Sequence, residues 1–169
     1  MAECWWPAYI GVGSNLDAPL EQVNRAVAWL TELPDCAFAL ASSRYASAPL
    51  GPRDQPDFVN AVVGLLTRLS PEDLLKQLQA LEQCAGRRRD GERWGPRTLD
   101  LDLLVYAACT SDAAALTLPH PGIAERAFVT VPLAEIAPSL AVPRRGTAAA
   151  LARAHAGVAL RCVQPAPSG

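Results

Sequence analysis

Residues 99–106 read LDLDLLVY, and apolar and acidic side chains alternate over the first five of them. Because successive side chains of a β-strand point to opposite faces, the odd-numbered residues from Leu99 to Val105 are predicted to face the core together. Asp100 and Asp102 are then predicted to lie side by side on the other face, roughly 7 Å apart along the strand. The stretch predicts a strand with a core on one face and a carboxylate pair on the other.

Asp100 and Asp102 form a candidate metal site. Two neighbouring carboxylates repel each other unless a cation lies between them. Their hard oxygen atoms suit Mg²⁺, which typically takes one or two carboxylates together with phosphate oxygens and water. The alternative interpretation is an edge strand with two solvated aspartates.

A basic segment runs directly into this strand. Guanidinium groups pair with phosphate oxygens and stabilise the charge that develops in phosphoryl transfer. We therefore interpret the segment as a loop that closes over a polyphosphate, with Trp94 as a lid or stacking surface. A solvated arginine cluster is the alternative. The segment, residues 87–97, reads RRRDGERWGPR and contains Arg87, Arg88, Arg89, Arg93 and Arg97.

A second group of residues suits a flat ligand. In the predicted strand over residues 58–67, Phe58 and Asn60 share a face and place a ring beside an amide. A heteroaromatic ligand needs a stacking surface and an in-plane donor and acceptor, and Phe128 would add a second ring. His120 lies between two prolines and is predicted either to contact phosphate or to cap a turn. Phe58 as an ordinary core residue is the alternative.

The composition indicates one globular domain. The 169 residues are half hydrophobic and carry a formal net charge of −2, so neither nucleic acid nor an anionic membrane is indicated as a partner. Five scattered cysteines and two histidines offer little to zinc and fit a reducing compartment. The first residues do not resemble a signal peptide, and no apolar run approaches about twenty residues. We expect a cytoplasmic protein.

Predicted strands and helices alternate along the chain. This order predicts an α+β sandwich of ferredoxin-like type, in which helices pack on a mostly antiparallel central sheet. We expect residues 1–160 to form a single catalytic domain and residues 161–169 a flexible tail. Strands are predicted over 9–12, 36–46, 58–67, 99–106 and 115–118, and helices from 19, from 71 to 86, and over 125–136 and 147–154.

Several motifs together resemble the hydroxymethyldihydropterin pyrophosphokinase family of folate biosynthesis, over about residues 9–138. The resemblance implies a ferredoxin-like fold, usually a monomer, that transfers pyrophosphate from ATP to the hydroxymethyl group of 6-hydroxymethyl-7,8-dihydropterin and releases AMP. It also implies two Mg²⁺ ions. The motifs are GSN at 13–15, PLGP at 49–52, DQPDFVN at 54–60, RWGPRTLDLD at 93–102, LPHP at 118–121 and RAF at 126–128.

The resemblance also implies roles for individual residues. Catalytic roles fall to Arg87, Arg97, Asp100 and Asp102, of which the two aspartates are the metal ligands. Nucleotide contacts fall to Gln79, Glu82, Arg89, Trp94, Leu103, Thr117, His120 and Arg126. The pterin pocket is assigned to Ser47, Ala48, Leu50, Phe58, Asn60 and Phe128. The chain departs from the family pattern at Phe58, where Tyr is frequent, at Ser47-Ala48 in place of Thr-Pro, and at Ala115 in place of a basic residue.

Two other functions remain open from the sequence. One is a two-metal nucleotidyltransferase or nuclease, which would need a basic groove that the charge of −2 does not indicate. The other is a non-catalytic module that binds a pterin or a nucleotide. The complete aspartate pair and the arginine segment favour the enzyme.

Overall fold

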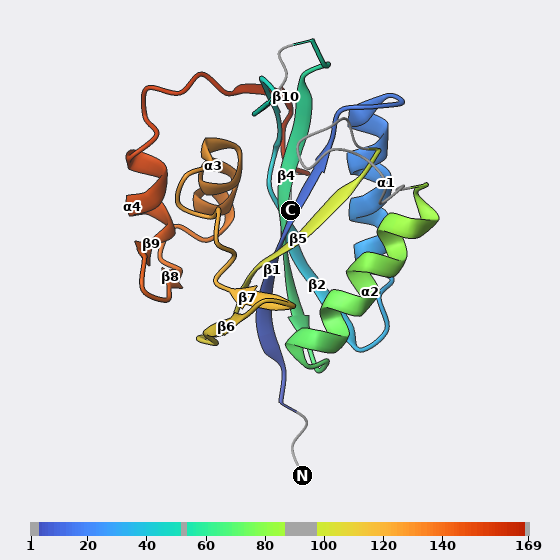
Figure 1. The fold of residues 1–169 in the computed structure, drawn as a ribbon, viewed down its shortest axis with the longest axis vertical. Helices are drawn as coiled ribbons and strands as arrows, with labels where there is room; N and C mark the ends of the chain where they lie inside the picture. Colours follow the sequence, from blue (N-terminus) through green and yellow to red (C-terminus); the bar gives the residue numbers. More distant parts are fainter. Residues whose placement is uncertain (1–3, 52–53, 87–97, 168–169) are drawn as a thin grey trace.

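The computed structural model describes residues 4–51, 54–86 and 98–167. They form a three-layer α+β structure, with α1 and α2 on one face of a central sheet and α3 and α4 on the other (Figure 1). The helices are α1 (Pro19–Thr31), α2 (Pro71–Cys84), α3 (Ala127–Ile136) and α4 (Ala148–Arg153). The strands are β1 (Trp6–Ser14), β2 (Cys36–Ala41), β3 (Arg44–Ser47), β4 (Phe58–Thr67), β5 (Asp100–Tyr106), β6 (Ser111–Ala113), β7 (Leu116–Leu118), β8 (Ala141–Val142), β9 (Gly146–Thr147) and β10 (Arg161–Gln164).

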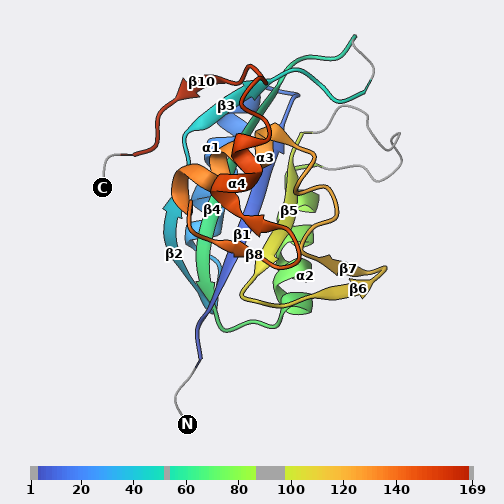
Figure 2. The ribbon, with the colours of Figure 1, turned by 90° about the vertical axis from the view of Figure 1, so that its left-hand side faces the viewer.

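The six-stranded sheet has the order β10-β3-β4-β1-β5, and β2 also pairs with β4. All of these pairs are antiparallel. β1 and β4 lie at the centre, and the chain leaves each of them through a helix on the same face before it returns to the sheet (Figure 2). This is the connectivity of a ferredoxin-like fold. The predicted α+β class is confirmed.

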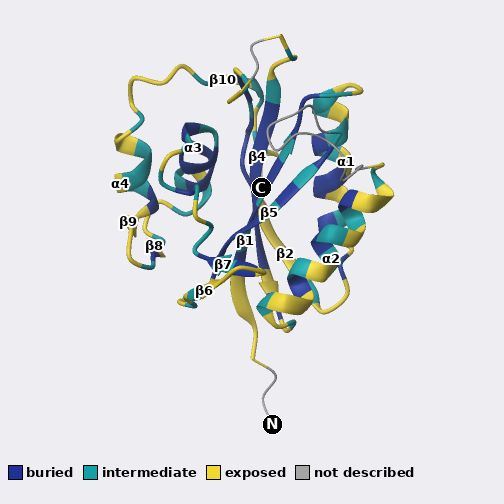
Figure 3. Cartoon of the chain, viewed as in Figure 1, coloured by how far each residue is buried: buried dark blue, intermediate teal, exposed yellow. Residues whose placement is uncertain are grey.

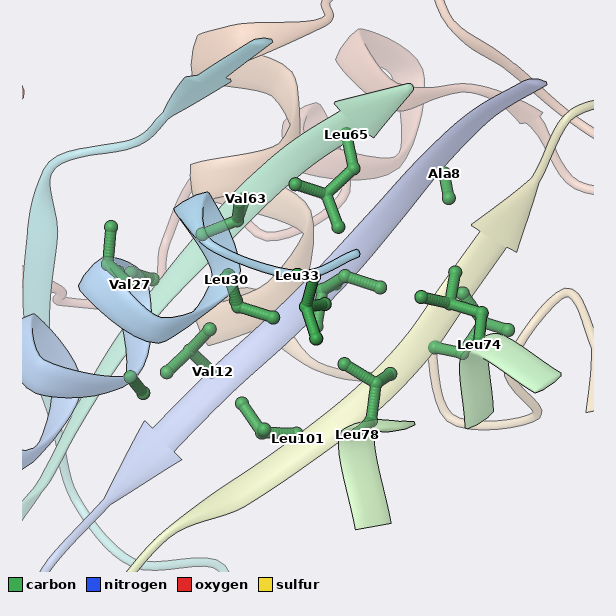
Figure 4. Packing of buried hydrophobic residues seen from close by; sticks show 14 of the residues in the cluster. Ala8, Val12, Val27, Leu30, Leu33, Val63, Leu65, Leu74, Leu78 and Leu101 are labelled. Atoms are coloured by element: carbon green, nitrogen blue, oxygen red, sulfur yellow. The ribbon is translucent and has the colours of Figure 1, made fainter. Parts of the chain in front are cut away.

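The larger part of the core lies between the sheet and the first two helices. Leu30 of α1 and Leu78 of α2 are fully buried and belong to the same cluster as Leu101 of β5 (Figure 4). α2 begins as predicted, because the Ser70 side chain accepts a hydrogen bond from the Asp73 N–H at 3.1 Å. The apolar sides of both helices therefore pack against one face of β5, and Asp100 and Asp102 point from the other face.

One prediction for β5 is wrong. Leu101 and Leu103 face the α1–α2 core as predicted, but Val105 belongs to the second core cluster, on the α3 face. The cause is a β-bulge: Ile10 pairs with Leu103 and Tyr9 with Val105, so Leu104 is an extra residue. The alternation of side chains between the two faces of β5, which puts both aspartates on one face, is therefore interrupted at Leu104.

Two strand boundaries also differ from the sequence prediction. β1 spans Trp6–Ser14, so it continues through Gly13 to Ser14, two residues beyond the predicted end at Val12. The predicted strand over 36–46 is instead two strands, which break at Ser42 and Ser43. At this break the Ser42 side chain accepts the N–H of Val62 at 2.9 Å, so a hydroxyl replaces a backbone carbonyl in the ladder.

The predicted flexible tail contains a strand. Residues 161–164 form β10, which pairs with the edge strand β3. A polar network secures it: the Arg44 Nε–H donates to Asn24 at 3.0 Å, and the Asn24 amide donates to Gln164 at 2.9 Å. The unpaired edge of a sheet readily pairs with another strand. Because β3 is distant in the sequence, the local pattern of residues 161–164 does not predict this pairing. The assignment of residues 1–160 to one catalytic domain stays a prediction.

Asn24→Ala is expected to lower the free energy of unfolding by about 1–3 kcal/mol, because it removes an acceptor from the Arg44 guanidinium. Arg44 is only 4% exposed, so water does not readily replace the lost partner. Urea denaturation would measure the change. Gln22→Ala is the matched control, since Gln22 lies on the same helix and its side chain makes an exposed hydrogen bond. Equal losses in the two variants would contradict the role of the network.

The sheet is not covered evenly. Figure 3 shows exposed residues toward the N-terminal end of β1 and along β2. Trp5 and Trp6 are 43% and 47% exposed there, and Arg68 lies 5.1 Å from the ring centre of Trp5. None of the helices in the described ranges combines the length and the apolarity that a membrane span needs.

Candidate active site

A cavity of about 440 Å³ lies on the α3 face of the sheet, where β1 ends and β4 and β5 begin. Its size falls within the range of about 300–1,000 Å³ that is typical of small-molecule sites. The cavity is lined by Gly11, Val12, Gly13, Ser47, Ala48, Leu50, Phe58, Asn60, Ala61, Asp100, Asp102, His120, Pro121, Gly122, Arg126, Phe128 and Val129.

Two glycines of β1 form the floor of the cavity. Gly11 pairs with Asp102 and Gly13 pairs with Asp100, so neither carboxylate has a side chain beside it on β1. On the other side of β1, Gly13 pairs with Asn60. A Cβ atom at residue 13 would lie 3.0 Å from the Asn60 Oδ1 atom. A Cβ atom at residue 11 would lie 3.3 Å from Leu104 Cδ2, so Leu104 packs over Gly11. The glycines therefore keep β1 side chains out of a channel that runs between the carboxylates and the Phe58–Asn60 strand.

Asn60 is buried at one wall of this channel. Its amide donates to the Ser47 hydroxyl at 2.8 Å, and this bond turns its Oδ1 atom toward Gly13. Phe58 lies on the same strand, two residues earlier, and Phe128 lines the cavity from α3. This end of the cavity combines two aromatic rings with an oriented amide.

Asp102 is the centre of the charged end. Its two carboxylate oxygens lie 3.7 Å from His120 Nε2 and 3.6 Å from Arg126 Nη1. Both distances are too long for hydrogen bonds, and the Arg126 contact is an ion pair. The Asp102 side chain keeps 33% of its exposure, so a bound ligand can reach it.

The bulge in β5 positions His120. The Leu104 carbonyl, which belongs to the extra residue, accepts the His120 N–H at 2.8 Å. The ring Nδ1 atom accepts the N–H of Gly122 at 3.1 Å, so a neutral ring carries its proton on Nε2, toward Asp102. Burial lowers the pKa of His120, although the Asp102 carboxylate acts in the opposite direction. These contacts hold the imidazole with its Nε2 atom facing Asp102 in the cavity.

Polar contacts tie the two side walls of the cavity together. Glu135 of α3 accepts the Ser43 hydroxyl at 2.7 Å and the Tyr45 hydroxyl at 2.9 Å. Burial, followed by the Glu135 contact, raises the pKa of Tyr45 to about 12. These bonds fix α3, which carries Phe128, against β3, which carries Ser47.

The structure brings ten of the predicted site residues together. All six residues of the predicted pterin pocket line the cavity, together with both aspartates, His120 and Arg126. The sequence interpretation missed Gly11, Gly13 and Gly122. A glycine at every second position of a buried strand indicates close approach by a ligand or another group, and Gly11 with Gly13 had this pattern.

Four predicted nucleotide-binding residues are not among the described residues that line the cavity. Gln79 lies half-buried on α2, and Glu82 is buried and accepts the Leu101 N–H at 2.8 Å. Leu103 belongs to the α1–α2 core, and the Thr117 hydroxyl donates to the Ala113 carbonyl at 3.2 Å. Their nucleotide contacts stay predictions. Arg87, Arg89, Trp94 and Arg97 lie outside the described residues.

The donor set at the charged end fits magnesium. Asp100 and Asp102 project from the same strand face into the cavity. Among the described residues, no group of three or more His, Cys, Asp or Glu side chains is gathered as a metal site would gather them. Two carboxylates with room for ligand oxygens suit Mg²⁺, which keeps several non-protein ligands, better than they suit zinc.

Comparison with known proteins decides the family. A family model described as 7,8-dihydro-6-hydroxymethylpterin-pyrophosphokinase (HPPK) matches residues 9–138. The chain belongs to the HPPK family. The resemblance inferred from the sequence motifs is confirmed, and the match includes every cavity residue.

The HPPK family relatives are close in sequence. A 2-amino-4-hydroxy-6-hydroxymethyldihydropteridine pyrophosphokinase of Pseudomonas aeruginosa is 49% identical over 135 residues, which cover 80% of this chain and 83% of the relative. The enzyme of the same name from Haemophilus influenzae is 48% identical over 136 residues, which cover 80% of this chain and 84% of the relative.

Solved structures support the HPPK fold. Plasmodium falciparum HPPK-DHPS, solved as the wild type with STZ-DHP, matches 91% of this chain with a TM-score of 0.73. The sequences are 11% identical, so this likeness bears on the fold alone. The chain covers 44% of that protein, which is less than half of its length.

Proposed function

We propose that this member of the HPPK family transfers pyrophosphate from ATP to the hydroxymethyl group of 6-hydroxymethyl-7,8-dihydropterin and releases AMP. The observation that carries the proposal is one cavity with two chemically different ends, in a chain that the HPPK model matches over residues 9–138. The aromatic end suits a pterin ring, and the charged end suits a triphosphate.

The residues at the aromatic end would bind and orient the pterin. Phe58 and Phe128 offer ring surfaces, and the Asn60 Oδ1 atom is turned into the channel as an acceptor for ring N–H or amino groups. The glycine floor then lets the hydroxymethyl group extend toward the aspartates. Placing the two reactants in one cavity replaces a bimolecular encounter by an oriented reaction, which is a large part of catalysis in such transfers.

At the charged end, the pterin oxygen would attack the β-phosphorus of ATP. The bond from that phosphorus to the bridging α–β oxygen breaks, AMP leaves with this oxygen, and the hydroxyl proton passes to water. His120 and Arg126 would donate to phosphate oxygens, since both are held facing Asp102. Asp100 and Asp102 would hold two Mg²⁺ ions, which when bound would neutralise charge on the triphosphate.

The direct test is AMP formation from ATP, measured with the dihydropterin alcohol and Mg²⁺, and again with excess EDTA. We expect AMP only when the pterin and Mg²⁺ are both present. Release of AMP or phosphate without the pterin would indicate a hydrolase instead. Binding of both ligands without AMP formation would favour a non-catalytic module, and incorporation of nucleotide into an oligonucleotide would favour a nucleotidyltransferase.

Phe58→Ala is expected to raise the KM for the pterin by roughly 5- to 150-fold, because one stacking surface is worth about 1–3 kcal/mol. The KM for ATP should change little, since Phe58 lies at the aromatic end. Steady-state kinetics with each substrate varied in turn would measure both values. Phe58→Tyr is the matched control and should retain the pterin KM. An equal rise in both KM values would contradict the division of the cavity.

A further inference from the structure

Gly122 lies in the turn between β7 and α3, where it lines the cavity between His120 and Arg126. We propose that Gly122 is a positioning residue for the pyrophosphoryl transfer. Because it has no side chain, it leaves the space that the Arg126 guanidinium occupies. Its N–H group donates to His120 Nδ1 and so orients the His120 ring. This inference rests on the proposed function.

The backbone does not require glycine at residue 122. Among the described glycines, Gly51, Gly86 and Gly146 have a positive φ, and Gly122 is not one of them. Gly86 shows the opposite case, because its φ is +83° while a Cβ atom there would meet nothing within 4 Å. An L-residue can adopt the Gly122 conformation, so the constraint at this position is space.

Arg126 occupies the space that a side chain at residue 122 would need. A Cβ atom there would lie 2.7 Å from Arg126 Nε, 2.8 Å from Cζ and 3.1 Å from one terminal nitrogen, Nη2. The other terminal nitrogen, Nη1, is directed to Asp102 at 3.6 Å. Contact with the bare Cα of Gly122 therefore sets where the guanidinium lies relative to the carboxylates.

An added methyl group would move Arg126 and leave the fold in place. The clashing atoms belong to the end of a flexible side chain, so the guanidinium yields before the backbone does. The N–H of residue 122, which donates to His120 Nδ1 at 3.1 Å, is retained in alanine. Gly122→Ala thus separates the two contacts and changes mainly the position of Arg126.

The experiment is a double-mutant cycle on AMP formation with Gly122→Ala, Arg126→Ala and both together. We expect Gly122→Ala to lower kcat/KM for ATP by roughly 10- to 100-fold, the scale of an ångström-sized misplacement. In the Arg126→Ala background the same change should have less than about a twofold effect, because the residue through which it acts is gone. Gly157→Ala, at a glycine with no atom within 4 Å of its Cβ position, is the control.

Two outcomes would overturn the proposal: no loss in Gly122→Ala, or an equal loss in both backgrounds. If Gly122→Ala does not fold, Gly122→Ala with Arg126→Lys replaces it, because lysine lacks the branched atoms beside residue 122. The kcat/KM of that double variant should equal that of Arg126→Lys alone, and a further loss would also overturn the proposal.

A wild-type chain that forms no AMP would refute the proposed function. Binding of a non-hydrolysable ATP analogue by the same variants would then test the role of Gly122 independently.

Discussion

Asp102→Asn is expected to lower kcat/KM for AMP formation by about 10³-fold or more, which is the upper scale for the loss of one group that stabilises transition-state charge. The amide keeps the shape of the carboxylate but loses its charge, and it is a weaker ligand for a hard cation. His120 and Arg126 also lose the anion that both of them face. The Mg²⁺ concentration that gives half-maximal activity should rise in the same variant.

The control for this prediction is Asp112→Asn. Asp112 forms an ion pair with Arg144 at 3.1 Å, and its side chain is 78% exposed, on the β6–β7 hairpin and away from the described cavity residues. Its activity should stay within about twofold of the wild type, because exposed pairs of this kind contribute little. Wild-type activity in Asp102→Asn would refute the assignment of the aspartate pair to the metal.

Leu78→Ala is expected to lower the free energy of unfolding by about 2–5 kcal/mol. Leu78 is fully buried on α2, in the cluster that also holds Leu101 of β5. The loss combines transfer of the side chain to water with a cavity that the neighbours fill only in part. Because domains of this size have about 5–15 kcal/mol of stability, the variant would lose a large share of it.

Urea denaturation would measure this loss, with Leu81→Ala as the control. Leu81 lies on the same helix and packs only partly against the cluster, so its truncation should cost clearly less. The activity of the folded fraction of Leu78→Ala should be retained at low temperature, since Leu78 is not among the described residues that line the cavity. Similar losses in the two leucine variants would contradict the packing described for α2.

The sequence predicted those parts of the fold that depend on local signals. β4 spans residues 58–67 as predicted, because its apolar run ends at both sides in turn residues. α2 begins at the predicted cap and first proline. Residues two apart share a face in any strand, so Asp100 lies beside Asp102 and Phe58 beside Asn60. Both pairs line the cavity.

What could not be predicted depends on partners that are distant in the sequence. The break at Ser42 exists because its hydroxyl accepts the N–H of Val62, twenty residues later. β10 forms because β3 offers it an edge, and the bulge at Leu104 is visible only in its pairing with β1. For the same reason the site was predicted only in part: the glycine floor needs the register of β1 against its neighbours.

The bulge also determines what the loss of one residue from β5 would change. Loss of Leu104 would restore regular pairing and still leave Leu103, Val105 and Tyr106 on their present faces. The same deletion would remove a buried side chain and the carbonyl that receives the His120 N–H. The sheet could still pair after this one-residue deletion, but the His120 imidazole would lose the backbone hydrogen bond that positions it. The length of β5 therefore matters for the active site more than for the fold.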